Sequence, residues 1–522
     1  MRLGIDFGTT RIVAAAVDRG NYPVVSFDCP DGAVRDWLPP LVAVDGATRA
    51  YGWDAWALQG RQGVTVVRSL KRILADAGPS TQVSLGGQTV PLMAVLGEMT
   101  AHVRLQLAQH SSLGLLPGEP VEVLLGVPAN ANTNQRFLTV EAFRAAGFEV
   151  LGLLNEPSAA SIEYAHRLGD SESSGYLLVY DLGGGTFDVS LVERAGRAHS
   201  VVASEGIPTL GGDDFDELLA QAALDAAGLT HHELTPIEEF LLAEECREKK
   251  ESLHPNTRKI VLDLDRVRDG LGTAALPVAD FYEHCRPLVD ETMHATEDLL
   301  SRLPDLSGVT LYVTGGGSEL PLVGRALREQ FGRRVRRSAY TRSATAIGLA
   351  IQADAQAGYQ LRERFTRHFG VWREAECGRR MIFDPLFEKG TALPAPGQPP
   401  LEQTRSYRPV HNVGHFRYLE CSHRAPDGSP TGDITAWDEI RFPFDPALAM
   451  VEDLGAVEVQ HAPAAEPHTI EERYRADSTG AVHVEIANLT AGYSRRYRLA
   501  RWAASEEVVV PSKAKRRRKA SK

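Results

Sequence analysis

Two stretches of the chain, IDFGTT at residues 5–10 and YDLGGGT at residues 180–186, repeat one arrangement of residue types. Each is an apolar segment that carries an aspartate, followed by glycine and threonine, and each leads into a second apolar segment. The pattern predicts two β-hairpins with glycine-rich tips. Glycine lets backbone N–H groups approach phosphate oxygens, and threonine adds a hydroxyl donor. The aspartate would hold a cation or its water shell, since a carboxylate does not bind phosphate directly.

A single such hairpin could be an ordinary glycine-containing turn. Two copies, each opening one half of an α/β region, favour a shared function. The motif differs from a P-loop, because no Gly-Lys-Ser/Thr follows either copy. It also differs from the dinucleotide-binding fingerprint, which opens a helix and not a second strand. Two facing hairpins would clamp the phosphates of a nucleotide between two similar lobes.

The length of 522 residues predicts several domains. Up to about residue 355, strand-like and helix-like segments alternate as in an α/β domain, for example a strand at 121–127 and a helix capped by Asn132. Beyond residue 369 the segments are short and alternating, and Val482, Val484 and Ile486 share one face of a strand. We therefore expect an α/β domain at 1–355, a linker at 356–368, a β-sandwich at 369–508 and a disordered basic tail at 509–522.

The net charge of −12 hides an uneven distribution, because residues 513–522 carry seven Lys or Arg. Without these seven charges the net charge falls from −12 to −19, which argues against a broad nucleic-acid-binding face on the folded body. The five scattered cysteines indicate reduced thiols. Neither a signal peptide nor a membrane-spanning segment is apparent, so we expect a cytoplasmic protein.

Further motifs occur in the order found in the DnaK-type (seventy-kilodalton) heat-shock chaperones, a family of the actin-like ATPase superfamily. The two glycine-rich loops resemble the family's two phosphate motifs, and NEPSAA at 155–160 resembles the start of its connecting helix. Similar agreement is found for LKR at 70–72, GVPA at 126–129, LGGDDFD at 210–216 and GGGS at 315–318. The resemblance covers about the first 350 residues and implies a duplicated, two-lobed ATPase domain that uses ATP and Mg²⁺.

The resemblance also implies roles for individual residues. Lys71, Glu156, Asp181 and Thr186 would be catalytic, and Asp6 and Asp181 would hold the magnesium ion through water. The remaining nucleotide contacts would come from Gly8, Thr9, Thr10, Gly183, Gly184, Gly185, Gly211, Gly212, Asp213, Lys250, Gly315, Gly316, Gly317 and Ser318. Taken alone, Lys71 would be a solvated helix charge and Glu156 a first-turn carboxylate, and only the order of the motifs favours the catalytic interpretation.

The base side of the site departs from the family pattern. The family has an arginine that packs on adenine before an apolar residue and a proline, whereas this chain has Glu319 before Leu320 and Pro321. The helix that offers Glu, Lys and Ser to the nucleoside reads Arg247, Lys250 and His254 here, with Glu248 as an alternative alignment for the first position. The sequence therefore predicts complete phosphate machinery with weaker affinity for the nucleotide or relaxed choice of base.

The second half resembles the family's β-sandwich substrate domain at 470–499 and, more locally, at 387–394. Such a domain would bind an extended apolar peptide, although a β-domain without a client is the alternative. The expected leucine-rich acidic linker is replaced by LRERF at 361–365, and no helical lid follows the sandwich, so fast client exchange is expected.

The favoured function is an ATP-dependent chaperone that binds ATP and ADP and an unfolded or specific client polypeptide. A J-domain co-chaperone and a nucleotide exchange factor are expected partners by resemblance. Contact of the basic tail with nucleic acid or membrane is not favoured over a solubilising role. The alternatives are a small-molecule kinase, an actin-like polymerising protein, and a scaffold that binds nucleotide without turnover.

Overall fold

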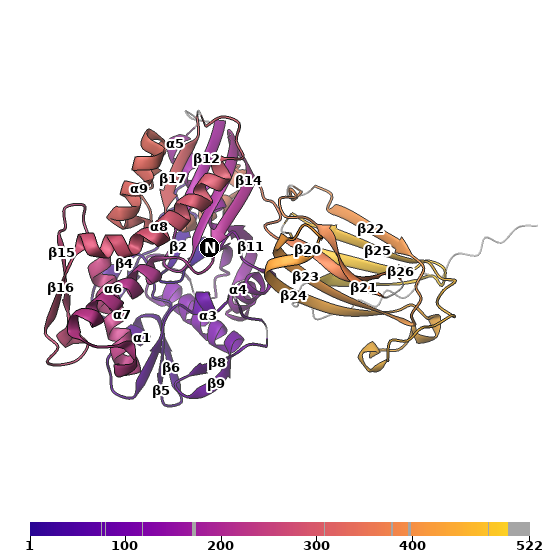
Figure 1. The fold of residues 1–522 in the computed structure, drawn as a ribbon, viewed down its shortest axis with the longest axis horizontal. Helices are drawn as coiled ribbons and strands as arrows, with labels where there is room; N and C mark the ends of the chain where they lie inside the picture. The colour runs from indigo at the N-terminus through magenta and orange to yellow at the C-terminus, as the bar shows by residue number, and fades with distance from the viewer. Residues whose placement is uncertain are drawn as a thin grey trace, which may run out of the picture. The chain divides into compact units, whose positions relative to one another are not determined.

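The computed structural model describes residues 1–499, apart from residues 75, 79, 117, 170–173, 307, 377–378, 395–397 and 479 and the side chains of residues 438 and 498. The expected basic tail at 509–522 and Cys377 therefore lie outside the described residues. The chain divides into two units, the first Met1–Arg362 and the second beginning at Glu363 (Figure 1). Cys29, Cys246, Cys285 and Cys421 are buried and free. No helix in the described ranges is long and apolar enough to cross a membrane.

The first glycine-rich hairpin belongs to a four-stranded sheet in the order β11-β10-β1-β2. Its strands are β1 (Arg2–Phe7), β2 (Ile12–Ala16), β10 (Glu122–Val127) and β11 (Glu149–Asn155). β1 pairs antiparallel with β2 and parallel with β10. Helix α4 (Thr133–Ala145) joins β10 to β11, and the Asn132 side chain accepts a hydrogen bond of 2.9 Å from the Gln135 N–H. The predicted hairpin and helix cap are confirmed.

The second hairpin belongs to a six-stranded sheet in the order β18-β17-β12-β13-β14-β19. The strands are β12 (Ser174–Leu182), β13 (Phe187–Ala195), β14 (Ala198–Ile207), β17 (Thr310–Thr314), β18 (Val335–Arg337) and β19 (Gln360–Arg362). β12 pairs antiparallel with β13, so the second predicted hairpin is also confirmed. β19 lies within the segment expected as a linker, and it pairs parallel with β14 before the division between the units.

Two buried helices pack against these sheets, α5 (Glu156–Leu168) and α10 (Ala344–Ala353). Their apolar side chains form one cluster with residues of β2, β13 and β14. The helices cross closely, because a Cβ atom on Gly348 would lie 1.8 Å from the Ala159 carbonyl oxygen. The small residues of the predicted NEPSAA segment thus allow close helix packing beside the site.

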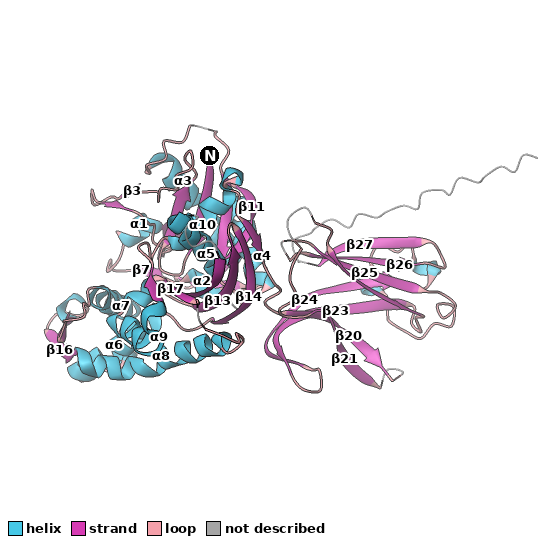
Figure 2. Ribbon diagram, turned by 90° about the horizontal axis from the view of Figure 1, so that it is seen from above, coloured by secondary structure: helices cyan, strands magenta, loops and turns pink. Residues whose placement is uncertain are grey.

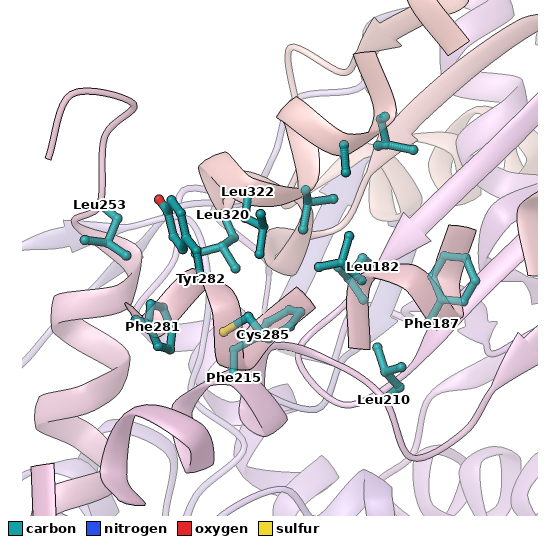
Figure 3. Packing of buried hydrophobic residues seen from close by; sticks show 14 of the residues in the cluster. Leu182, Phe187, Leu210, Phe215, Leu253, Phe281, Tyr282, Cys285, Leu320 and Leu322 are labelled. Atoms are coloured by element: carbon teal, nitrogen blue, oxygen red, sulfur yellow. The ribbon is translucent and has the colours of Figure 1, made fainter. Parts of the chain in front are cut away.

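Four helices share a core with strands of the second sheet, α6 (Gly212–Ala227), α7 (Pro236–Glu251), α8 (Val278–Leu300) and α9 (Pro321–Phe331). Figure 2 shows them gathered in one part of the first unit, next to the hairpin of β15 (Lys259–Asp263) and β16 (Thr273–Pro277). Their core includes Phe215, Phe281 and Cys285, which meet Leu182 and Leu320 (Figure 3). Each fully buried aromatic or aliphatic side chain of this kind contributes about 1.5–3 kcal/mol.

The described residues between the first hairpin and β10 form small sheets and three helices. The elements are β3 (Phe27–Asp28), β4 (Val34–Arg35), β5 (Val42–Asp45), β6 (Thr48–Tyr51), α1 (Gly52–Trp56), β7 (Val64–Val67), α2 (Leu70–Ile73), β8 (Gln82–Leu85), β9 (Gln88–Pro91) and α3 (Leu92–Gln109). Helix α2 carries Lys71, whose side chain is buried and not solvated.

The second unit is a sandwich of two antiparallel sheets, in the orders β21-β20-β23-β24 and β22-β25-β26-β27. The strands are β20 (His368–Ala375), β21 (Arg380–Phe387), β22 (Leu401–Tyr407), β23 (Val413–Arg424), β24 (Pro430–Pro443), β25 (Ile470–Ala476), β26 (Val482–Asn488) and β27 (Tyr493–Leu499). Apolar residues of both sheets share one core, in which Val482, Val484 and Ile486 are buried as predicted. Arg373 of one sheet pairs with the fully buried Glu472 of the other at 2.6 Å.

Candidate nucleotide site

The tips of the two glycine-rich hairpins face each other in the first unit. A Cβ atom on Gly184 would lie 2.4 Å from Thr10 Cγ2, so a larger residue would collide with the opposite tip. The Gly183 N–H donates a hydrogen bond of 2.9 Å to the Thr186 carbonyl and closes the second tip. Duplicate motifs that lie far apart in the sequence therefore build the two sides of one site.

A cavity opens beside these tips, and most of the predicted site residues line it. Its walls are formed by Asp6, Gly8, Thr9, Thr10, Arg11, Val13, Lys71, Glu156, Asp181, Gly183, Gly184, Thr186, Gly212, Asp213, Arg247, Lys250, Glu251, Gly315, Gly316, Gly317, Glu319, Leu320, Thr341, Arg342 and Thr345. Three predicted residues are not on this wall. Gly185 lies in the second tip, Gly211 precedes helix α6, and the Ser318 hydroxyl donates to the Gly315 carbonyl at 2.6 Å.

Lys71 is the buried cation of the site. Its Nζ lies 2.5 Å from Glu156 Oε1, and the two side chains are only 7 % and 10 % exposed. Burial lowers the pKa of Lys71, but the charges of Glu156 and Asp6 outweigh burial and raise it. The ammonium group therefore stays charged at neutral pH and faces the cavity between the hairpins.

Three aspartates surround this ion pair. Burial and the charge of Glu156 raise the pKa of Asp6 and of Asp188 to about 7 in each case, while Lys71 lowers both. Burial and the same neighbouring carboxylates raise the pKa of Asp181 well above its usual value. The site thus holds four buried carboxyl groups, of Asp6, Glu156, Asp181 and Asp188, beside one ammonium group, and their mutual repulsion disfavours full ionisation.

Asp188 is a residue of the site that the sequence interpretation missed. It stands directly opposite Asp181 in the register of β12 and β13, and its Oδ1 accepts a hydrogen bond of 3.0 Å from the Ala129 N–H. The corresponding position of the first hairpin, opposite Asp6, is Val13. A second aspartate seven residues after Asp181 was the available signal, because a hairpin places such residues side by side.

A further cation would favour the ionised forms of these crowded carboxyl groups. Asp6 Oδ1 is buried without a hydrogen-bond partner. Among the described residues, no group of three His, Cys, Asp or Glu lies close enough to ligate a metal directly. The buried carboxyl groups of Asp6 and Asp181 are oxygen donors of the kind that suits a hydrated magnesium ion.

The start of helix α6 forms another wall of the cavity. Its first two N–H groups, of Gly212 and Asp213, donate to the carbonyls of Gly183 and Gly184 at 2.9 and 2.8 Å. Lys250 donates to the Gly212 carbonyl at 2.5 Å and pairs with Asp216 at 2.7 Å. This network fixes the second hairpin tip against α6 and α7.

The opposite end of the cavity carries the reversed charge noted in the sequence. Glu319 stands where the family pattern has arginine, but Arg342 lies beside it, with Nη2 2.5 Å from Glu319 Oε2. The same guanidinium pairs with Glu251 at 3.0 Å, and Arg11 pairs with Glu251 at 2.7 Å. The four side chains form a chain of alternating charge that the sequence interpretation did not assemble.

Helix α7 borders the same end of the cavity. Arg247 pairs with Asp213 and lines the cavity. His254 is exposed outside the cavity, and Glu248 pairs with Arg266 on the surface. The first alignment of this helix, with Arg247 toward the nucleoside, therefore describes its orientation better than the alignment with Glu248.

Two α/β halves around a cleft with duplicated glycine-rich hairpins define the first unit as a nucleotide-binding domain of the actin-like ATPase type. The family model described as Hsp70 protein matches residues 2–365. The chain therefore belongs to the Hsp70 family, and the predicted relationship to the DnaK-type chaperones is confirmed.

Named relatives agree with this assignment. A "Chaperone protein HscA homolog" of Chromobacterium violaceum is 34 % identical over 380 residues, which cover 69 % of this chain and 59 % of that protein. A protein of the same name from Laribacter hongkongensis is 35 % identical over 389 residues, with the same shares covered. "Chaperone protein HscA" of Klebsiella pneumoniae is 32 % identical over 374 residues, which cover 68 % and 58 %. The chain therefore spans about 59 % of the length of such curated relatives.

Proposed function

We propose that the first unit binds ATP between its two hairpin tips and hydrolyses it to ADP. The observation that carries this proposal is the buried Lys71–Glu156 pair, surrounded by three aspartates at the point where the tips meet. Backbone N–H groups of the tips and the hydroxyls of Thr9, Thr10 and Thr186 supply phosphate donors. The alternating charges at the other end of the cavity face the nucleoside.

The chain's own groups have distinct tasks in this reaction. The Lys71 ammonium would stabilise the charge that develops on the γ-phosphate, and Glu156 holds that ammonium in place. Asp181 and Asp188 are both buried with raised pKa values, which suits groups that accept a proton from an attacking water. When magnesium is bound, it neutralises phosphate charge and supplies bound water. Thr186 lines the cavity and would contact the γ-phosphate.

Arg342 takes over the place of the family's base-stacking arginine in this proposal. Glu319 and Glu251 hold its guanidinium plane from two sides. A planar guanidinium fixed in this way can stack on a purine. The reversed charge at Glu319 thus changes which residue supplies the platform, and base selectivity depends on the four-residue chain of Arg11, Glu251, Arg342 and Glu319.

We further infer a chaperone function in which the sandwich of the second unit binds an extended polypeptide segment. The relatives' names as chaperones support this inference, together with the two-sheet architecture of the unit. J-domain co-chaperones and exchange factors remain expected partners. A small-molecule kinase, a polymerising protein or a non-hydrolysing scaffold would use the same cleft, but none of them calls for a β-sandwich.

Single-turnover hydrolysis of ATP, with and without an unfolded polypeptide, tests both parts of the proposal. The expected result is release of one phosphate per chain and a changed rate when the polypeptide is present. Nucleotide binding without phosphate release would support the scaffold. Phosphate transfer to a sugar, or sedimentation of ATP-dependent filaments, would instead favour the kinase or the polymerising protein.

A further inference from the structure

A cluster of arginines covers one edge of the first unit, outside the nucleotide cleft. It spans helix α9, the 3₁₀ turn η5 (Gly332–Arg334) and strand β18, beside the labelled helix α9 in Figure 1. Residues 321–338 contain six arginines and a single acidic residue, Glu329. The arginines are Arg325, Arg328, Arg333, Arg334, Arg336 and Arg337, and all are exposed. We call this surface the arginine edge.

Most arginines of the arginine edge are not paired with an acidic side chain, unlike the arginines of the cleft. Within the described ranges, Arg328, Arg333, Arg334 and Arg336 make no hydrogen bond or ion pair through their side chains. Arg337 approaches Glu319 only at 3.8 Å. The arginines of the cleft, by contrast, pair at distances such as 2.5 Å for Arg342 with Glu319. Like charges held together without partners repel one another, and a bound carboxylate would relieve that repulsion.

Two hollows lie along the arginine edge, and their walls combine basic, apolar and acidic residues, with Glu329 on both. One, of about 570 Å³, is lined by Arg333, Arg334 and Arg336 together with Val309 and Phe331. The other, of about 640 Å³, is lined by Arg325, Arg328 and Arg337, by the apolar Leu320, Leu327 and Val335, and by the acidic Glu251, Glu319 and Glu329. The first hollow has more arginines than acidic residues, so a ligand that matches the edge needs negative charge there and apolar groups for both hollows.

We propose that the arginine edge is a docking surface for an acidic segment of a partner protein. Aspartate and glutamate side chains would pair with the fork-shaped guanidinium groups of Arg333, Arg334 and Arg336. Apolar side chains of the same segment would enter the two hollows. β18 is the edge strand of its sheet and pairs only with β17 in the described part of the chain, so an extended segment can lie along its open side.

A nucleic acid fits this surface less well than an acidic polypeptide. The arginine edge is confined to one short segment, while the chain without its last ten residues carries a net charge of −19. A nucleic-acid backbone presents negative charge along its whole length, and the negative net charge of the rest of the chain repels it. A short acidic segment ends within the edge, and its apolar side chains use walls that phosphates do not.

Fluorescence anisotropy of a labelled acidic peptide tests the proposal on the full chain. The probe is a peptide of about a dozen residues in which every second residue is Glu and the residues between are Ser or Leu. It represents an extended acidic segment of the proposed kind. All proteins carry serine in place of the basic residues of the tail, so that the tail does not bind the probe. These tail residues are Lys513, Lys515, Arg516, Arg517, Arg518, Lys519 and Lys522.

The test variant combines Arg333→Ser, Arg334→Ser and Arg336→Ser, and the matched control combines Arg61→Ser, Arg258→Ser and Arg379→Ser at exposed sites elsewhere. Both remove three positive charges. The test variant should raise the dissociation constant of the peptide by roughly tenfold or more, and the control should change it less than about twofold. Hydrolysis of ATP, measured on the same proteins, should be unchanged and reports an intact first unit.

Equal effects of the two triple variants would overturn the proposal, because net charge alone would then explain the binding. Tighter binding of a single-stranded DNA probe of the same length than of the peptide would overturn it in favour of nucleic acid. A peptide in which Leu is replaced by Ser should bind more weakly. If it bound as tightly as the original, the hollows would play no part and the surface would not be a specific docking site.

Discussion

Replacing Lys71 by methionine tests the charge balance of the nucleotide site. The change keeps most of the side-chain volume but removes the ammonium group that lies 2.5 Å from Glu156 Oε1. Both side chains are almost fully buried, so water does not replace the lost partner. Removing one member of such a pair costs about 3–5 kcal/mol, because the other charge remains buried and unpaired.

Neighbours of the same sign increase this cost. In the variant, Glu156 faces Asp6, Asp181 and Asp188 without the cation that lowers their pKa values. We therefore expect the free energy of unfolding to fall by the upper end of that range, about 5 kcal/mol. Urea unfolding followed by helical ellipticity measures it in the first unit, since the described part of the second unit has strands and 3₁₀ turns but no α-helix.

The double variant Lys71→Met with Glu156→Gln is the matched control, since it removes both charges. Its free energy of unfolding should be about 2–3 kcal/mol higher than that of Lys71→Met, because the coupling energy between two residues in direct contact is of this size. In single-turnover hydrolysis, each variant should be slower by roughly a hundredfold to a thousandfold. A Lys71→Met protein within about 1 kcal/mol of the parent, as for a surface pair, would refute the reasoning. So would a double variant no more stable than the single one.

Three further substitutions test other parts of the first unit. Gly184→Val places a side chain 2.4 Å from Thr10, so nucleotide affinity should fall roughly thirtyfold, about 2 kcal/mol by calorimetry. Arg342→Ala should weaken ADP binding more than Arg337→Ala does, because only Arg342 lines the cavity; equal losses would exclude a base platform. Burial lowers the pKa of His199 to about 4, so its neutral form is favoured and stability falls as the pH drops below the unfolded value. Between about pH 7.5 and pH 5, the free energy of unfolding should therefore fall by about 2 kcal/mol less in His199→Gln than in the parent protein, as measured by urea unfolding.

The hairpins, the Asn132 cap and the inward face of β26 could be predicted because each depends on neighbours in the sequence. Lys71 and Glu156 could be proposed only through motif order, since 85 positions separate them and nothing local shows their ion pair. Asp188 was missed because its position opposite Asp181 depends on the register of the two strands.

The partner of Glu319 was missed for a related reason. Arg342 follows β18, 23 positions after Glu319, and local sequence gives no sign that the two side chains meet. A charge reversal was therefore visible at one residue, while its compensation by another was not. Such pairs require the fold to be known before they can be recognised.

Glu319 and Glu251 each belong to the walls of two cavities, the nucleotide cavity and one hollow of the arginine edge. Arg342 forms an ion pair with Oε2 of the Glu319 carboxylate, and Arg337 approaches its other oxygen, Oε1. An anion that binds Arg337 would leave Glu319 with Arg342 and Thr341 and so change how firmly the guanidinium plane is held. By thermodynamic linkage, a nucleotide that shifts Arg342 would change the affinity of the arginine edge by the same factor. A carboxylate shared by two walls would in this way couple the binding of two separate ligands.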